Sequence, residues 1–359
     1  MCPPPEDPKT TTIGNMKGVI GFLSAATIGL LIATIALAVD KDDSPAVAVP
    51  VTVTETVTVT ETVIDFPTVK PPTGDNICEG KKVDLPNKPC FEEGVSEQAG
   101  ANVTKGYNGD LETSAVPITT EYWEAGLCPV NVHWHLGTEH YSLGEYDETG
   151  TGPSEIAERR RLAGKVREGF QCKYYDESDE KYTKEYDWKH CVGMEVGQTY
   201  EVHWPHSSLG ACGTLNQYQT PFYDGVFCNT HLLDVTNIPA QIGVQAQVFT
   251  IVNDEDYYYP DLIKGMIIDG EIGTDKAYYT GSTTGTSRDN EICSSYTPIT
   301  WQVDRKCNLV SASTFDKMCA DMKAQRDDMS DDLYAHGSRE LVADEYAANN
   351  QVRNLRRKD

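Results

Sequence analysis

The chain has 359 residues, enough for one large domain or two smaller ones. It carries 30 Lys and Arg against 55 Asp and Glu, a formal net charge of −25 at pH 7. Because so acidic a protein is repelled by phosphate backbones and anionic lipid headgroups, the composition argues against nucleic-acid binding.

The first predicted element is an apolar segment from Gly18 to Val39, 22 residues without a charge. At 1.5 Å per residue such a helix spans roughly 33 Å, which crosses a hydrocarbon core of about 30 Å. Lysines precede the segment and "DKDD" follows it, so residues 1–17 are expected in the cytosol and the remainder outside or in a lumen. A cleavable signal peptide is the alternative, because Ala36-Leu37-Ala38 resembles a cleavage site. We expect residues 18–39 to be a retained signal anchor in a lipid bilayer.

Residues 40–76 are rich in Val, Thr and Pro, and Val-Thr-Glu-Thr-Val occurs twice, at 53–57 and 59–63. This low complexity predicts an extended stalk between the membrane and a folded domain. The sequence contains one N-x-S/T site, Asn102-Val103-Thr104, which is consistent with a glycoprotein of the secretory pathway. No second linker follows, so residues 77–359 are predicted to form one domain.

Cysteine usage indicates an oxidising compartment. One of the eleven cysteines precedes the apolar segment and ten follow it, without a CxxC pair or zinc-finger spacing. An even number of scattered cysteines predicts up to five disulfides, with a connectivity that spacing does not reveal. We expect Cys128 to be in a disulfide rather than to act as a nucleophile.

Short alternating segments predict a mainly β domain with a central twisted sheet and peripheral helices. The expected strands are 130–136, 199–204, 244–252, 265–272 and 297–303, and the expected helices are 154–170 and 311–329.

Three histidines lie within eight positions in "CPVNVHWHLGTEHYS", residues 128–142. Residues i and i+2 of a strand face the same side, so His133 and His135 are expected to project together. Two adjacent imidazoles can form half of a zinc site, although two polar residues on a solvated face would give the same pattern.

A second segment, "TYEVHWPHSS" (199–208), strengthens the metal prediction. Glu201 and His203 share one strand face, so the carboxylate can accept the second N–H of the imidazole and orient it. His206 is an alternative ligand, which we expect on a loop because it follows Pro205. Three histidines would leave a fourth tetrahedral position for water, as in catalytic zinc sites.

Together, "CPVNVHWHLGTEHYS" and "EVHWPHSSLGAC" resemble the delta-class carbonic anhydrases of diatoms and other marine phytoplankton. The order of elements also resembles the alpha class, in which an HxH strand, a Glu-His pair and an E-x-H strand precede a threonine loop and a tryptophan. Here "YYTGSTTGTS" (278–287) and "TPITWQV" (297–303) occupy those places. The resemblance implies an alpha-carbonic-anhydrase-like fold and reversible hydration of CO2 to bicarbonate by a zinc-bound hydroxide.

The resemblance also implies a role for each matching residue. His133, His135 and His203 would hold Zn2+, for which cobalt or cadmium could substitute, and Glu201 would orient His203. Thr284 would accept a hydrogen bond from the hydroxide and donate its own to Glu139. His140 and Tyr279 would be buried structural partners. Trp301, with Val248 of the 244–252 strand, would line the CO2 pocket.

The chain departs from the alpha-class pattern in three respects. The proline after the threonine loop is absent, so Thr283 is an alternative to Thr284. His135 and His203 are 68 positions apart, and a charged insert at 174–190 occupies part of that gap. No histidine precedes His133, so the alpha-class proton shuttle has no counterpart, and His206, His190 or buffer are the alternatives. Two other functions remain open: a catalytically silent binding module on a stalk, and a different zinc hydrolase such as an esterase.

Overall fold

The computed structural model describes residues 100–153, 166–214, 217–219, 225–282, 299–325 and 332–350. The predicted anchor (18–39) and stalk (40–76) lie outside these residues. In the described part of the chain, no helix is both long enough and apolar enough to cross a bilayer.

The observed elements confirm a mainly β architecture. The strands are β1 (Cys128–Pro129), β2 (His133–Leu136), β3 (Tyr146–Asp147), β4 (Gln171–Cys172), β5 (Thr199–Ser207), β6 (Ile242–Val252), β7 (Lys276–Gly281) and β8 (Ile299–Ser311). The α-helices are α2 (Glu180–Thr183) and α4 (Ala312–Gln325). Short 3-10 helices are η1 (Thr230–Leu232), η2 (Ile238–Ala240), η3 (Glu255–Tyr257), η4 (Leu262–Lys264) and η6 (Asp344–Tyr346).

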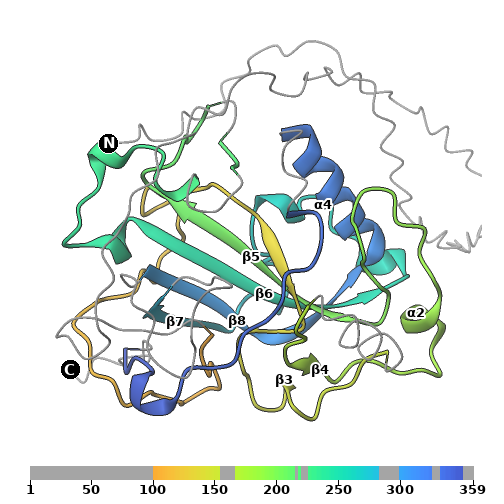
Figure 1. Cartoon of the computed structure of the whole chain (residues 1–359). Helices are drawn as coiled ribbons and strands as arrows, with labels where there is room; N and C mark the ends of the chain where they lie inside the picture. The colour runs from red at the N-terminus through yellow and green to blue at the C-terminus, as the bar shows by residue number, and fades with distance from the viewer. Residues whose placement is uncertain are drawn as a thin grey trace, which may run out of the picture. The chain divides into compact units, whose positions relative to one another are not determined.

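Within these residues a mixed sheet has the order β1-β5-β6-β8-β7, and β2 pairs with β5 beyond β1 along the same edge. Figure 1 shows β5, β6, β8 and β7 side by side, with α4 continuing from the end of β8. The pairing is antiparallel except between β6 and β8, which run parallel. Every residue of β5 and β6 is buried, as expected for central strands covered on both faces.

Two hydrophobic clusters cover the two faces of this sheet. Tyr200, Val202 and Trp204 of β5 belong to the cluster that also contains Phe315 of α4. The cluster on the opposite face contains Val248 of β6, Tyr279 of β7 and Trp301 of β8. Because neighbouring side chains of a strand point to opposite faces, the odd-numbered residues of β5 lie on the face away from α4.

Some predicted elements differ from the structure. The predicted strand 265–272 is wrong: this segment follows η4 and contains only an isolated bridge between Asp269 and Ile272. Its glycines explain the difference, since Gly265 and Gly270 both have positive φ, at 151° and 58°. The helix predicted over 154–170 lies largely outside the described residues, and its end, 166–170, is not helical.

Disulfides connect distant parts of the fold. The structure contains Cys128–Cys212, Cys172–Cys307 and Cys191–Cys319, and Cys228 is disulfide-bonded as well. The prediction that Cys128 is oxidised is therefore confirmed. These bonds indicate folding in an extracellular or lumenal compartment.

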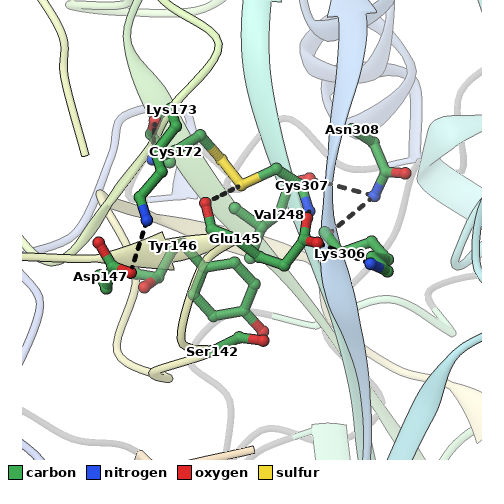
Figure 2. Close-up of a disulfide and its surroundings, with 12 residues drawn as sticks. Ser142, Glu145, Tyr146, Asp147, Cys172, Lys173, Val248, Lys306, Cys307 and Asn308 are labelled. Atoms are coloured by element: carbon green, nitrogen blue, oxygen red, sulfur yellow. Dashed lines mark hydrogen bonds and ion pairs between the residues drawn. A yellow bond between two sulfur atoms is a disulfide. The ribbon is translucent and has the colours of Figure 1, made fainter. Parts of the chain in front are cut away.

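The bond between Cys172 and Cys307 joins β4 to the central strand β8 (Figure 2). Cys307 pairs in register with Val248, and Val248 pairs on its other side with Glu201. Beside the bridge, Lys306 Nζ lies 2.6 Å from Glu145 Oε1. A covalent link therefore stands two strands away from Glu201.

Candidate metal centre

The pairing of β2 with β5 brings the three predicted ligands together. His133 lies opposite His203 in the antiparallel register, and His135 lies opposite Glu201. The ring centroids of His133 and His135 are 5.3 and 4.6 Å from that of His203. One ligand atom of each imidazole lies within 4.8 Å of the others, and all three residues are buried. Such a cluster can hold a metal ion.

Hydrogen bonds fix the protonated nitrogen of two of these rings. His133 Nδ1 lies 2.7 Å from Asn131 Oδ1, and His135 Nδ1 lies 3.1 Å from the carbonyl oxygen of Gly337. Because both partners only accept hydrogen bonds, each Nδ1 donates and each Nε2 keeps its lone pair. His135 Nε2 is buried and has no hydrogen-bond partner, as expected for an atom that faces a ligand position.

Glu201 is the central anion of the site. Its Oε1 bonds His140 Nδ1 and lies 3.3 Å from His203 Nε2, while its Oε2 accepts the backbone N–H of Glu139 at 2.6 Å. Both nitrogens of His203 are buried without a hydrogen-bond partner, and Nδ1 is the one away from the carboxylate. The ring thus has one nitrogen beside a carboxylate and the other free to bind a cation.

Burial and charge favour the protonation states that metal binding requires. Burial, followed by the neighbouring imidazoles, holds the pKa values of His133 and His135 well below the usual range, so both rings are neutral at pH 7. Burial alone would raise the pKa of Glu201, but His140 and His203 lower it well below the usual range. The pocket therefore combines neutral imidazoles with the buried carboxylate of Glu201.

A row of buried aromatic groups supports this carboxylate. His140 Nε2 lies 2.7 Å from the hydroxyl of Tyr279, whose ring is parallel to that of Trp301 at 5.9 Å. The Trp301 ring also lies edge-on to His203 at 5.3 Å. Val248, the register neighbour of Glu201, is fully buried in the same cluster. An apolar wall therefore adjoins His203.

Glu139 reaches the site because the chain turns sharply after β2. Gly137 has φ of 68°, and a Cβ there would lie 2.6 Å from the backbone nitrogen of Gly169. Glu139 Oε1 lies 3.5 Å from His135 Nδ1 and 3.6 Å from Arg339 Nε, and Oε2 is buried and unbonded. Burial raises the pKa of Glu139, and Arg339 opposes the rise.

His206 differs from its prediction. It lies on β5, which continues through Pro205 to Ser207, and not on a loop. Alternation along the strand directs it away from the face of His203. Its Nδ1 donates to the carbonyl oxygen of Trp204 at 2.7 Å, and its ring contacts that of Tyr122 edge-on at 5.0 Å. These contacts are those of a core residue.

His206 predicts a pH-dependent loss of stability. Burial lowers its pKa to about 4, below an unfolded value of about 6.5, so the unfolded state binds the proton more tightly. Its contribution is present above pH 6.5 and is lost as the pH falls towards 4, by roughly 3 kcal/mol. Urea denaturation at pH 7 and pH 4 measures this effect. Between these two pH values the free energy of unfolding should decrease by roughly 3 kcal/mol more in the parent protein than in His206→Phe. Parallel decreases would contradict this effect.

Sequence comparison assigns the family. A family model described as delta carbonic anhydrase matches residues 124–314, just over half of the chain, and this range contains all three histidines and Glu201. The chain belongs to the delta carbonic anhydrase family. Membership implies an enzyme of the lyase class that hydrates CO2 to bicarbonate.

Among solved structures, the chain is similar to an alpha-carbonic anhydrase from Thermovibrio ammonificans, solved with the inhibitor sulfanilamide. The sequences are 11% identical, and the match covers 74% of this chain and 83% of that one, with a TM-score of 0.23. This score is too low to support an argument about fold or site. No curated protein sequence matches the chain.

The structure brings together most of the predicted site residues and adds others. Thr284, the predicted partner of Glu139, lies outside the described residues. Asn131, Gly337 and Arg339 were not predicted to belong to the site. Asn131 carries a signal in the sequence, because it alternates with His133 and His135 and so shares their strand face. Gly337 and Arg339 reach the site only through tertiary structure.

A surface cavity of about 450 Å³ lies on another side of Arg339. Its walls include Arg167, Glu168 and Phe170, but none of the three histidines. Arg339 is the residue that this cavity shares with the surroundings of Glu139. His133, His135 and His203 are themselves buried.

Proposed function

We propose that the chain catalyses reversible hydration of CO2 at a zinc ion held by His133, His135 and His203. One observation supports this proposal above all: three buried imidazoles face one another, and His135 Nε2 and His203 Nδ1 have no hydrogen-bond partner. Buried polar atoms without partners are costly, and a bound cation removes that cost. Nitrogen ligands of this number and type suit Zn2+, although cobalt or cadmium would also be accepted.

When bound, zinc would supply Lewis acidity that lowers the pKa of a coordinated water to about 7. The surrounding residues prepare the ligands for this. Asn131 and the Gly337 carbonyl accept the Nδ1 protons of His133 and His135, so both rings present Nε2. Glu201 lies beside the second nitrogen of His203 and makes that ring a stronger donor.

The remaining residues define where the substrate reacts. Trp301 and Val248 would give CO2, which carries no net charge, an apolar wall. Glu139 has an unbonded buried oxygen that can accept a hydrogen bond from a hydroxyl group. We propose Thr284 as that hydroxyl. Its oxygen would accept a hydrogen bond from the attacking group, so that only a nucleophile that carries a hydrogen would fit the site.

Removal of the metal tests this proposal. After dialysis against a chelator, stopped-flow CO2 hydration by the purified protein should fall to near the buffer rate, and one equivalent of Zn2+ should restore it. The reason is that the bound metal would lower the pKa of water enough to supply hydroxide at neutral pH. Full activity with metal content below 0.1 equivalent would contradict it. The chelated protein should keep its circular dichroism spectrum, which separates metal loss from unfolding.

Substrate preference separates this function from its alternatives. A zinc hydrolase of the esterase type would act faster on simple esters than on CO2, and a silent binding module would act on neither. The apolar wall around His203 favours CO2, and the complete ligand set argues against a silent module. Parallel assays with CO2 and a nitrophenyl ester, each with and without zinc, distinguish the three functions.

For the whole chain we propose a membrane-anchored organisation. Residues 1–17 would lie in the cytosol, 18–39 would form a signal anchor, 40–76 a stalk and 77–359 the catalytic domain. The uncharged segment and the disulfides of the domain support a location outside the cytosol. Asn102 is the proposed glycosylation site. Alkaline extraction of membranes would leave such a chain in the pellet, whereas a cleaved chain would be released.

A further inference from the structure

Residues 332–338, here called the C-terminal strap, lie along β2. His336 N donates to the Trp134 carbonyl at 2.7 Å, and Leu136 N donates to the His336 carbonyl at 2.9 Å. Ser338 Oγ adds a bond of 2.8 Å to the Leu136 carbonyl. The strap lies beyond the residues that match the family model, 124–314, yet it pairs with the strand that carries His133 and His135.

Asn131 connects the strap to His133. Its side-chain nitrogen donates to the Gln219 carbonyl at 2.8 Å and to Asp332 Oδ2 at 2.9 Å. Both protons of the amide are thus committed, so its oxygen must face the other way, where it accepts from His133 Nδ1 at 2.7 Å. All four residues are buried, so water does not compete for these bonds.

We propose that Asp332 is a positioning residue for the metal centre and acts on His133 through Asn131. A carboxylate that accepts from the amide N–H makes the amide oxygen a stronger acceptor, because hydrogen bonds in series polarise one another. The stronger acceptor holds His133 in the Nδ1-protonated form and raises the donor strength of Nε2. This inference rests on the proposed function, because it treats His133 as a ligand.

A purely structural role for Asp332 gives a different expectation. Asp332 Oδ1 also lies 3.2 Å from His336 Nε2. In a purely structural role, the carboxylate would stabilise the strap through this contact and have no effect on His133. If that were its whole role, loss of the carboxylate would change stability and leave the metal affinity of the folded protein unchanged. The two roles are therefore distinguished by measuring zinc binding, independently of activity.

The experiment measures the zinc dissociation constant of the purified protein by competition with a chromophoric chelator. Asp332→Ala should bind zinc about tenfold more weakly, the lower end of the range for outer ligand partners, because Gln219 still holds the amide. Asn131→Ala should lose at least as much. The double variant should match Asn131→Ala within about twofold, since Asp332 then has no route to His133.

Conservative and matched variants complete the test. Asp332→Asn keeps an acceptor for Asn131 and should stay within about threefold of the parent protein, and it provides a folded variant if Asp332→Ala unfolds. Ser338→Ala removes the side-chain bond between the strap and the Leu136 carbonyl and should leave zinc affinity within about twofold. Circular dichroism establishes that each variant is folded.

Three outcomes would overturn the inference: an unchanged zinc affinity in folded Asp332→Ala, additive losses in the double variant, or an equal loss in Ser338→Ala. Failure of the proposed function gives a separate result. If the parent protein and His203→Ala bind zinc equally weakly, the three-histidine site itself is absent. If the parent protein binds zinc tightly and Asp332→Ala does too, only the role of Asp332 is contradicted.

Discussion

His203→Ala is expected to reduce CO2 hydration at least about a thousandfold, to near the uncatalysed rate. The substitution removes the proposed ligand that faces His133 across the β2–β5 ladder and leaves two imidazoles, too few for a tetrahedral catalytic site. Zinc content of the purified variant, measured by atomic absorption, should fall in parallel. Stopped-flow CO2 hydration at pH 8 is the primary measurement.

His206→Phe is the matched control for that loss. Both histidines are buried on β5, but alternation directs them to opposite faces of the sheet. The phenyl ring preserves the packing against Tyr122, and the variant should keep its zinc and its CO2 hydration within about threefold. A large loss of activity in a zinc-loaded His206→Phe would show that the third ligand is wrongly assigned. Retained activity in His203→Ala would show the same.

Loss of the Cys172–Cys307 disulfide should lower the free energy of unfolding. The bond joins residues 135 positions apart, and both cysteines are buried. Replacement of both by Ala should lower the free energy of unfolding by about 2–5 kcal/mol, through greater freedom of the unfolded chain and a void beside Val248. Scanning calorimetry should show a Tm lower by roughly 10 °C.

The Cys128–Cys212 pair provides the comparison. It spans 84 positions, and the logarithmic dependence on loop length makes its entropic contribution smaller by only about 0.4 kcal/mol. Cys128 and Cys212 are only partly buried, so their replacement leaves a smaller void. We therefore expect a smaller decrease in Tm for this pair. An equal or larger decrease would mean that packing around Cys172 contributes little.

The β-rich fold was predictable where side-chain alternation is regular. The predicted strands 199–204 and 244–252 correspond to β5 and β6, and the helix at 311–329 corresponds to α4, described to Gln325. The strand prediction for residues 265–272 was wrong because "GMIIDGEI" has strand-forming residues between glycines that turn the chain. Apolar content alone does not distinguish a strand from a buried turn.

The candidate site was predictable to the extent that its residues share a strand. His133 with His135, and Glu201 with His203, are each two positions apart, and this spacing alone places each pair on one face. That β2 pairs with β5 in the register opposing His133 and His203 is a tertiary fact that local spacing does not contain. The same holds for Asp332, which lies 201 positions from Asn131.

The proposed ligands precede the strap in the sequence, so the ribosome also synthesises them first. His203 emerges from the ribosome about 130 residues before Asp332, which at 5–20 residues per second is on the order of ten seconds earlier. During that interval the nascent chain carries all three imidazoles, but Asn131 lacks one of the partners that orient its amide. If Asp332 acts as proposed, tight zinc binding would be a late step of maturation that follows synthesis of the strap.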